Sequence, residues 1–122
     1  MGIAAGVLLA LSSAAHSLVG WPSMRQELAA AGAPPDLIFG MKMGWLFGGV
    51  CMLVFAAIVL RIFVRRFRGG VASPFPALVI GVAYFLFGAW ALVTSGFQPF
   101  YFVFIVPAVL LLGAGWGQPL FE

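Results

Sequence analysis

The sequence predicts an all-α integral membrane protein, a four-helix bundle of transmembrane spans with both termini in the cytoplasm. Of its 122 residues, 64% are hydrophobic and only 7% are charged, whereas about a quarter of the residues in a soluble domain are charged. The apolar residues form four segments, each close to the length of about 20 residues that crosses a bilayer as a helix. These segments lack the apolar–polar alternation of a barrel strand. The composition therefore excludes a soluble globular fold and predicts a single membrane domain, residues 1–122.

The first span is expected at residues 2–20, and the link after it is the only stretch with the polarity of a soluble protein. Ser23 followed three residues later by Gln26 is the pattern of a capping box, and Gly32 with two prolines after it is a helix stop signal. The link is therefore predicted to form a short extramembrane helix. Asp36 follows the prolines, where we expect it to cap the N-terminus of the second span.

The other three spans are expected at residues 37–63, 76–95 and 100–116. A basic cluster and two glycines lie between the second and third spans. The link between the last two, Gly96-Phe97-Gln98-Pro99, is so short that these spans must run antiparallel. Pro107 lies within the last span and should kink it, because proline donates no backbone hydrogen bond.

The orientation follows from the cations in the links. The second link is flanked by Arg61, Arg65, Arg66 and Arg68, while the first link contains only Arg25 and the third contains no Lys or Arg. By the positive-inside rule the second link is cytoplasmic, so an even number of spans places both termini there as well. We expect a multi-pass protein of a bacterial-type inner membrane. The four arginines are also candidates for binding anionic lipid headgroups, although orientation and anchoring alone explain them.

Small residues recur at the spacing that lets membrane helices pack closely. Gly40, Gly44 and Gly48 are four residues apart in the second span, and Gly2 and Gly6 are four apart in the first. Because burial of apolar surface does not drive helix association in lipid, such GxxxG faces are typical of helix–helix contacts. We expect the first two spans to meet along these glycines, with a contact to another chain as the alternative.

A polar stripe on the first span is the main candidate site. His16, the only histidine, lies with Ser12, Ser13 and Ser17 on an otherwise apolar helix, and Lys42 lies at similar depth in the second span. Ionisable residues inside a membrane are by default functional-site hypotheses. The alternative is structural: Lys42 extends to the headgroups, and His16 bonds a serine or a carbonyl. Further polar side chains at the outer ends of the last two spans are expected to join this cluster: Thr94, Ser95, Gln98 and Tyr101.

The same residues are candidates for binding a cofactor. A neutral His16 imidazole is a weak candidate to ligate a haem or a chlorophyll-type pigment, with the remaining axial position open or filled by another subunit. Deep aromatic side chains are candidates to line a site for a quinone or pigment, although packing against lipid or a neighbouring subunit is the more common reason for such residues: Trp45, Phe47, Tyr84, Phe85, Phe87 and Trp90. No metal site is predicted beyond His16.

Two functional classes remain. No catalytic motif occurs, so we expect no enzyme, and the few cations exclude a nucleic-acid surface. The first class is a non-catalytic accessory subunit that packs against lipids and other membrane subunits, or copies of itself, in a larger complex. An energy-converting complex that carries cofactors is one candidate. The alternative is a small homo-oligomeric transporter or channel with an outward-facing pocket around His16 and Lys42.

Overall fold

The computed structural model describes residues 1–116, and these residues are all-helical, as predicted, with no strand among them. Glycines, prolines and polar link residues separate the apolar stretches into distinct helices. In chain order the elements are α1 (Gly2–Ala15), the π-helical segment η1 (His16–Gly20), α2 (Trp21–Ala30), α3 (Pro35–Phe67), α4 (Phe75–Thr94), the 3₁₀ turn η2 (Pro99–Tyr101) and α5 (Phe102–Gly115).

The first helix does not stop where the sequence predicts. The chain remains helical from Gly2 through η1 to Ala30, and Gly20 before α2 has helical dihedrals and provides no side-chain cap. The predicted capping box at Ser23 is therefore not used, and α2 extends the first helix instead of forming a separate one. Pro22 does not break the helix, because the wider π turn before it relaxes the contact with the preceding carbonyls. The predicted stop is confirmed, since Gly32 has a φ of +73°.

Helix α3 begins two residues before the predicted span and runs past its predicted end. Its N-cap is Pro34 in an extended conformation, with Pro35 at the first helical position. The prediction that Asp36 caps this helix is therefore wrong. Asp36 lies in the first turn instead, where a carboxylate still interacts favourably with the helix dipole. At the other end Gly69, with a φ of +79°, turns the chain toward α4.

Helices α4 and α5 form the predicted antiparallel hairpin. The turn between them contains Gly96 and Phe97, both with positive φ. The two helices pack closely at Gly88, where a Cβ would lie 2.9 Å from the Cβ of Phe104. Pro107 lies inside α5, buried against the other helices.

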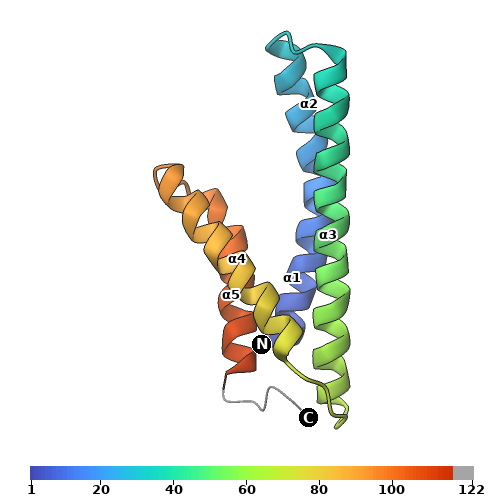
Figure 1. Ribbon diagram of the computed structural model, residues 1–122, viewed down its shortest axis with the longest axis vertical. Coiled ribbons are helices and arrows are strands. Elements are labelled where there is room, and N and C mark those ends of the chain that lie inside the picture. The colour runs from blue at the N-terminus through green and yellow to red at the C-terminus, as the bar shows by residue number, and fades with distance from the viewer. Residues whose placement is uncertain (117–122) are drawn as a thin grey trace.

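The two hairpins meet at one end and diverge toward the other, as Figure 1 shows. Helix α1 contacts α5 and α3 contacts α4, whereas η1 and α2 contact neither α4 nor α5. The core lies at the shared end, where small side chains allow close approach: Ala5, Leu9, Ala56, Val59, Ala77, Ala108 and Leu111. Farther along, the ring of Phe55 on α3 faces the ring of Tyr84 on α4, with the two ring centroids 6.3 Å apart. The helices therefore form two hairpins joined at one end, and the predicted four-helix transmembrane bundle stays a prediction.

Three helices are long and apolar enough to cross a membrane, namely residues 2–30, α3 and α4. The 29 residues of the first and the 33 residues of α3 correspond to about 43 and 50 Å of helix, more than the hydrocarbon core of about 30 Å. Both must tilt or project beyond the core. The fourth apolar helix, Pro99–Gly115, is shorter.

Candidate functional site

His16 and Trp45 form a reciprocal pair that joins the first helix to α3. The His16 ring Nε2 lies 3.0 Å from the carbonyl oxygen of Trp45, and the Trp45 indole N–H donates to the carbonyl oxygen of His16 at 2.7 Å. The two rings are stacked, with centroids 4.5 Å apart and planes within 2° of parallel. Two hydrogen bonds and one ring contact therefore fix the relative position of the helices at this level.

The π-helical segment exposes the carbonyl that Trp45 uses. His16 is the first residue of η1, and its carbonyl oxygen also accepts the backbone N–H of Trp21, five residues later. A π turn widens the helix and changes the direction of its carbonyls, and such turns are frequent at functional sites. Gly20 ends this segment, and a Cβ there would lie 3.0 Å from the indole of Trp45. A larger residue at position 20 would therefore displace the indole.

Serines extend the same contact toward the middle of the helix. The buried Ser13 hydroxyl donates to the carbonyl oxygen of Gly49 at 2.7 Å. Ser17 lies against Gly49 so closely that a Cβ at this glycine would overlap the Ser17 hydroxyl oxygen. Three residues of the predicted polar stripe, Ser13, His16 and Ser17, therefore face α3. The acceptors of Ser13 and His16 are backbone carbonyls that have a second lone pair to offer. Ser12 is half-buried.

The geometry limits what His16 can bind. A carbonyl oxygen only accepts hydrogen bonds, so in the neutral imidazole Nε2 carries the proton and Nδ1 keeps the lone pair. Ligation of a haem or pigment through Nε2 would break the bond to Trp45, and that residue already covers one ring face. Residues 1–116 contain no group of three or more His, Cys, Asp or Glu side chains that could hold a metal ion. The residues present fit a structural role for His16 better than metal ligation through Nε2.

Comparison with known protein families, curated proteins and solved structures found no match.

Lys42 does not join the His16 cluster. Its side chain is exposed, one helical turn from Trp45, and no contact to His16 is formed. The polar residues at the tip of the second hairpin are also remote, because that tip diverges from η1. They bond locally: the Thr94 hydroxyl donates to the carbonyl oxygen of Trp90 at 2.9 Å, and the Ser95 hydroxyl donates to that of Leu92 at 3.1 Å. The expectation that these residues close one polar cluster is therefore wrong.

The glycines separate into packed and open positions. A Cβ at Gly6 would lie 2.7 Å from Leu60, and one at Gly2 would overlap the ring of Phe63, so both pack against α3 as predicted. A Cβ at Gly40 or Gly44, however, would meet nothing within 4 Å. The contact expected along those two glycines is therefore not formed among residues 1–116. Gly48 has only the His16 ring near it, and the packing position is the neighbouring Gly49.

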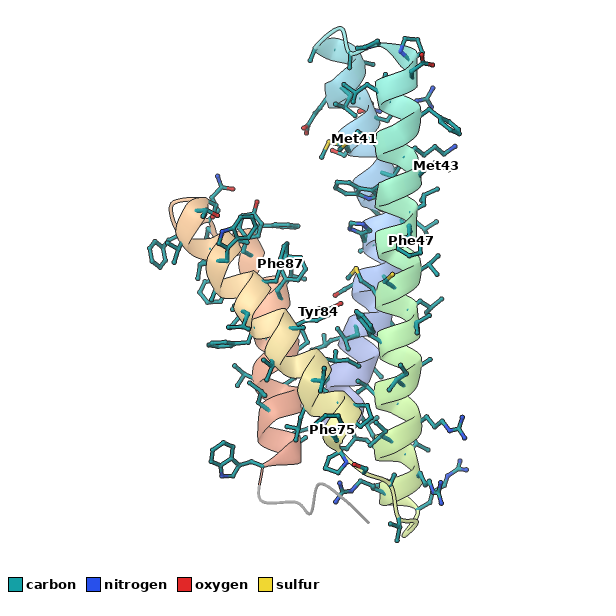
Figure 2. The ribbon with its side chains drawn as sticks, in the orientation of Figure 1. Met41, Met43, Phe47, Phe75, Tyr84 and Phe87 are labelled. Atoms are coloured by element: carbon teal, nitrogen blue, oxygen red, sulfur yellow. The ribbon has the colours of Figure 1, made fainter. Side chains whose placement is uncertain are left out.

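Of the six predicted aromatic residues, Tyr84, Phe87 and Trp90 are linked by ring contacts, with the Phe104 ring between Tyr84 and Phe87. Trp45 and Phe47 lie on the other hairpin. Trp45 pairs with His16, Tyr84 is buried in the core, and Phe47 and Trp90 are 69% and 62% exposed. Figure 2 shows Tyr84 and Phe87 on the side of α4 that faces the first hairpin. Sequence reasoning missed the partnership of Trp45 with His16, because residues 29 positions apart share no local pattern. A tryptophan at the depth of the only histidine was the one available signal.

Proposed function

We propose that the protein is a small, non-catalytic membrane subunit that packs against other membrane subunits or copies of itself. The observation that carries this proposal is the divergence of the two hairpins. Where they diverge, η1 and α2 touch only the first hairpin, and Phe87 and Trp90 on α4 remain 47% and 62% exposed. Helices in lipid associate through close packing, and a partner helix would supply the packing that this half of the molecule lacks.

The open glycine face supports the same proposal. Gly40 and Gly44 let another helix approach the α3 backbone, and the large side chains beside them, Phe39 and Met43, are exposed. A contact to another chain was the alternative use of these glycines. The intramolecular contact uses Gly49 and the first helix instead, which leaves Gly40 and Gly44 available to a partner.

We further propose that all four apolar helices span the membrane, with both termini in the cytoplasm of a bacterial-type cell. The stretch Pro99–Gly115 is shorter than the other three, but it packs along α4 in the hairpin. If α4 crosses the bilayer, α5 must return beside it, and about 17 residues lie at the lower limit for a span. The arginines at the end of α3 define the cytoplasmic side.

The transporter alternative has less support from the geometry. The hydroxyl of Ser13 and the ring Nε2 of His16 bond carbonyls of α3, and Lys42 is exposed. In the neutral imidazole, Nδ1 of His16 keeps its lone pair. We retain this alternative because the π turn at His16 is the type of local distortion that often accompanies function.

Purification from the native membrane in mild detergent tests the subunit role. We expect the chain to co-purify with other membrane proteins or with copies of itself, and Gly44→Leu to reduce this association while the helical content stays unchanged. By contrast, Gly6→Leu, at a glycine packed against α3, would disturb the fold itself. A chain that runs alone as a monomer from its native membrane would contradict the proposal. An absorption spectrum of the same sample reports any haem or pigment.

Labelling tests the orientation. Cys51 is the only cysteine and is half-buried, so a Cys51→Ala background leaves a single introduced thiol to react. A cysteine placed at Ala31 should react with a membrane-impermeant maleimide added to intact cells, whereas one at Val71 should react only after permeabilisation. The reverse pattern would overturn the orientation.

A further inference from the structure

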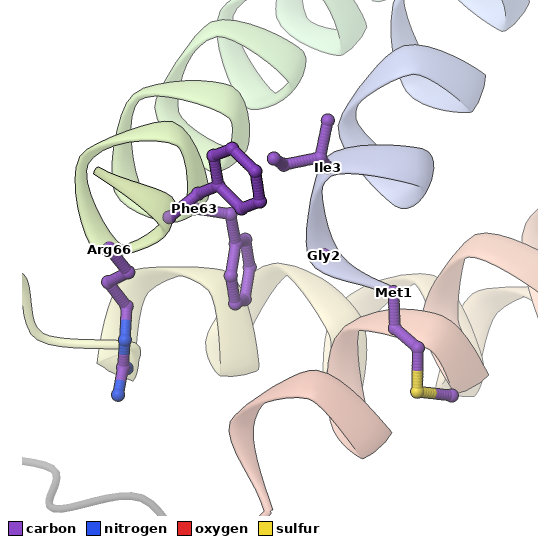
Figure 3. Close-up of a pocket in the computed structure, with 6 residues that line it drawn as sticks. Met1, Gly2, Ile3, Phe63 and Arg66 are labelled. Atoms are coloured by element: carbon purple, nitrogen blue, oxygen red, sulfur yellow. The ribbon is translucent and has the colours of Figure 1, made fainter. Parts of the chain in front are cut away.

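A shallow cavity, widely open at the surface, lies at the end of the molecule where the arginines gather, between the first turn of α1 and the last turns of α3. Its volume is about 380 Å³, which lies within the range of roughly 300–1,000 Å³ found for small-molecule sites. Figure 3 shows Phe63, Ile3 and Met1 around it, with Arg66 at one edge. The lining consists of Met1, Gly2, Ile3, Phe63, Arg66 and Phe67.

Arg66 differs from the other three arginines in its direction. Arg61, Arg65 and Arg68 recur at intervals of four and three residues, so they share one face of α3, and all three are exposed. Arg66 follows Arg65 by one residue and is therefore turned about 100° around the helix, toward the cavity. Its guanidinium is the only charged side chain in the lining.

The electrostatics of this end favour an anion. Four of the six Lys and Arg residues lie here, while Glu27 and Asp36, the acidic residues within positions 1–116, lie at the opposite end of the long helices. A guanidinium binds phosphate through two parallel N–H···O bonds. The site therefore places a phosphate-binding group at the basic end of the molecule.

The remaining side chains of the lining are apolar. The Phe63 ring packs on Gly2, and Phe67, one turn farther along, is 83% exposed. Arg66 lies three residues beyond Phe63, about 4.5 Å along the axis. An amphiphile whose anionic group is attached close to its hydrocarbon chain can therefore contact Arg66 and Phe63 together.

We propose that this cavity binds an anionic phospholipid, with the phosphate on Arg66 and the start of an acyl chain against Phe63 and Phe67. The cavity accommodates the phosphate and the first carbons, while the remainder of the lipid stays in the bilayer. The proposal needs only that this end lies at a membrane surface. It does not depend on the subunit role.

Native mass spectrometry of the full chain in mild detergent tests the site. Phosphatidylglycerol and phosphatidylcholine with identical acyl chains are titrated separately, and we expect one phosphatidylglycerol to bind with clear preference. Arg66→Gln should weaken its binding about fivefold, while the matched variant Arg61→Gln, on the exposed face, should change it less than twofold. Equal losses of phosphatidylglycerol binding in the two variants would show a diffuse attraction of the lipid to positive charge. That result would overturn the proposal of a defined site.

A second variant separates a lipid from free phosphate and does not depend on Arg66. Phe67 is largely exposed, so Phe67→Ala should leave the fold intact, as circular dichroism would verify. This variant should weaken phosphatidylglycerol binding and leave inorganic phosphate binding unchanged. Unaltered phosphatidylglycerol binding in Phe67→Ala, or inorganic phosphate binding as tight as the lipid, would overturn the proposal of a lipid site.

Discussion

At the scale of single residues, the contact between His16 and Trp45 concentrates the polar interactions of the first hairpin. Each side chain bonds the other's backbone carbonyl, at 3.0 and 2.7 Å, and the stacked rings fill the space between the helices. In a bilayer an unsatisfied polar group costs several kcal/mol, so neither side chain can lie at this depth without a partner. The pair satisfies both and fixes the register of the two helices.

Trp45→Phe should lower the free energy of unfolding by about 0.6–1.7 kcal/mol, because it removes the indole donor but keeps an aromatic ring on His16. The measurement is reversible unfolding in mixed detergent micelles. Trp90→Phe is the matched control: Trp90 is 62% exposed, and its replacement should change stability by less than about 0.5 kcal/mol. An equal loss in both variants would mean that the indole bond to His16 contributes nothing specific.

At the scale of elements, the first helix and α3 pack through only some of their glycines. A Cβ at Gly6 would contact Leu60 and Val59, while a Cβ at Gly44 would contact no described atom of another element within 4 Å. Both glycines belong to the same type of sequence repeat. Their roles differ because the rotation of each helix about its own axis decides which face meets the neighbour.

The same substitution at these two glycines should have opposite effects. Gly6→Ala should lower the free energy of unfolding by about 1–3 kcal/mol, because the new methyl group overlaps Leu60. Gly44→Ala should leave it unchanged or raise it by at most about 1 kcal/mol, since alanine favours the helix and nothing is displaced. Unfolding of the two purified variants in the same detergent measures both values. Equal destabilisation would place Gly44 in a contact within the chain.

At the scale of the whole molecule, two hairpins are joined mainly at the end where the arginines lie. Small core residues such as Ala5 and Ala108 are fully buried there, which allows the helices to approach. Toward the other end the hairpins separate, and the long first helix and α3 project past the turn of the second hairpin. This shape gives a partner helix access to side chains that a compact bundle would bury.

Distances between spin labels should report this divergence. Labels at Val7 and Val109, near the shared end, should give a shorter mean distance than labels at Leu18 and Phe102, near the separated end, because α1 contacts α5 whereas η1 does not. All four side chains are at least 45% exposed, so labelling should not disturb the core. Double electron–electron resonance in detergent and in liposomes gives both distances, and similar values would indicate a compact bundle.

The sequence alone established those features of the fold that depend on local residue chemistry. Continuous apolar stretches place helices in a membrane wherever they occur, so the helical class and three long membrane-compatible helices were predictable. The turn glycines Gly32 and Gly69 were predictable for the same reason, because a positive φ is a local requirement. The boundary at Ser23 was not, since a capping box favours a helix start but cannot prevent an existing helix from continuing.

Tertiary structure decided which faces of these helices meet. Helices α1, α3, α4 and α5 are apolar around most of their circumference, so their sequences do not indicate which side turns inward. Only packing determined that Gly49 rather than Gly44 contacts the first helix, that Trp45 is the partner of His16, and that the hairpins diverge. The scarcity of charged residues in the sequence determined the class, a membrane protein. The direction of the Arg66 side chain, in contrast, depended on the rotation of α3 about its axis.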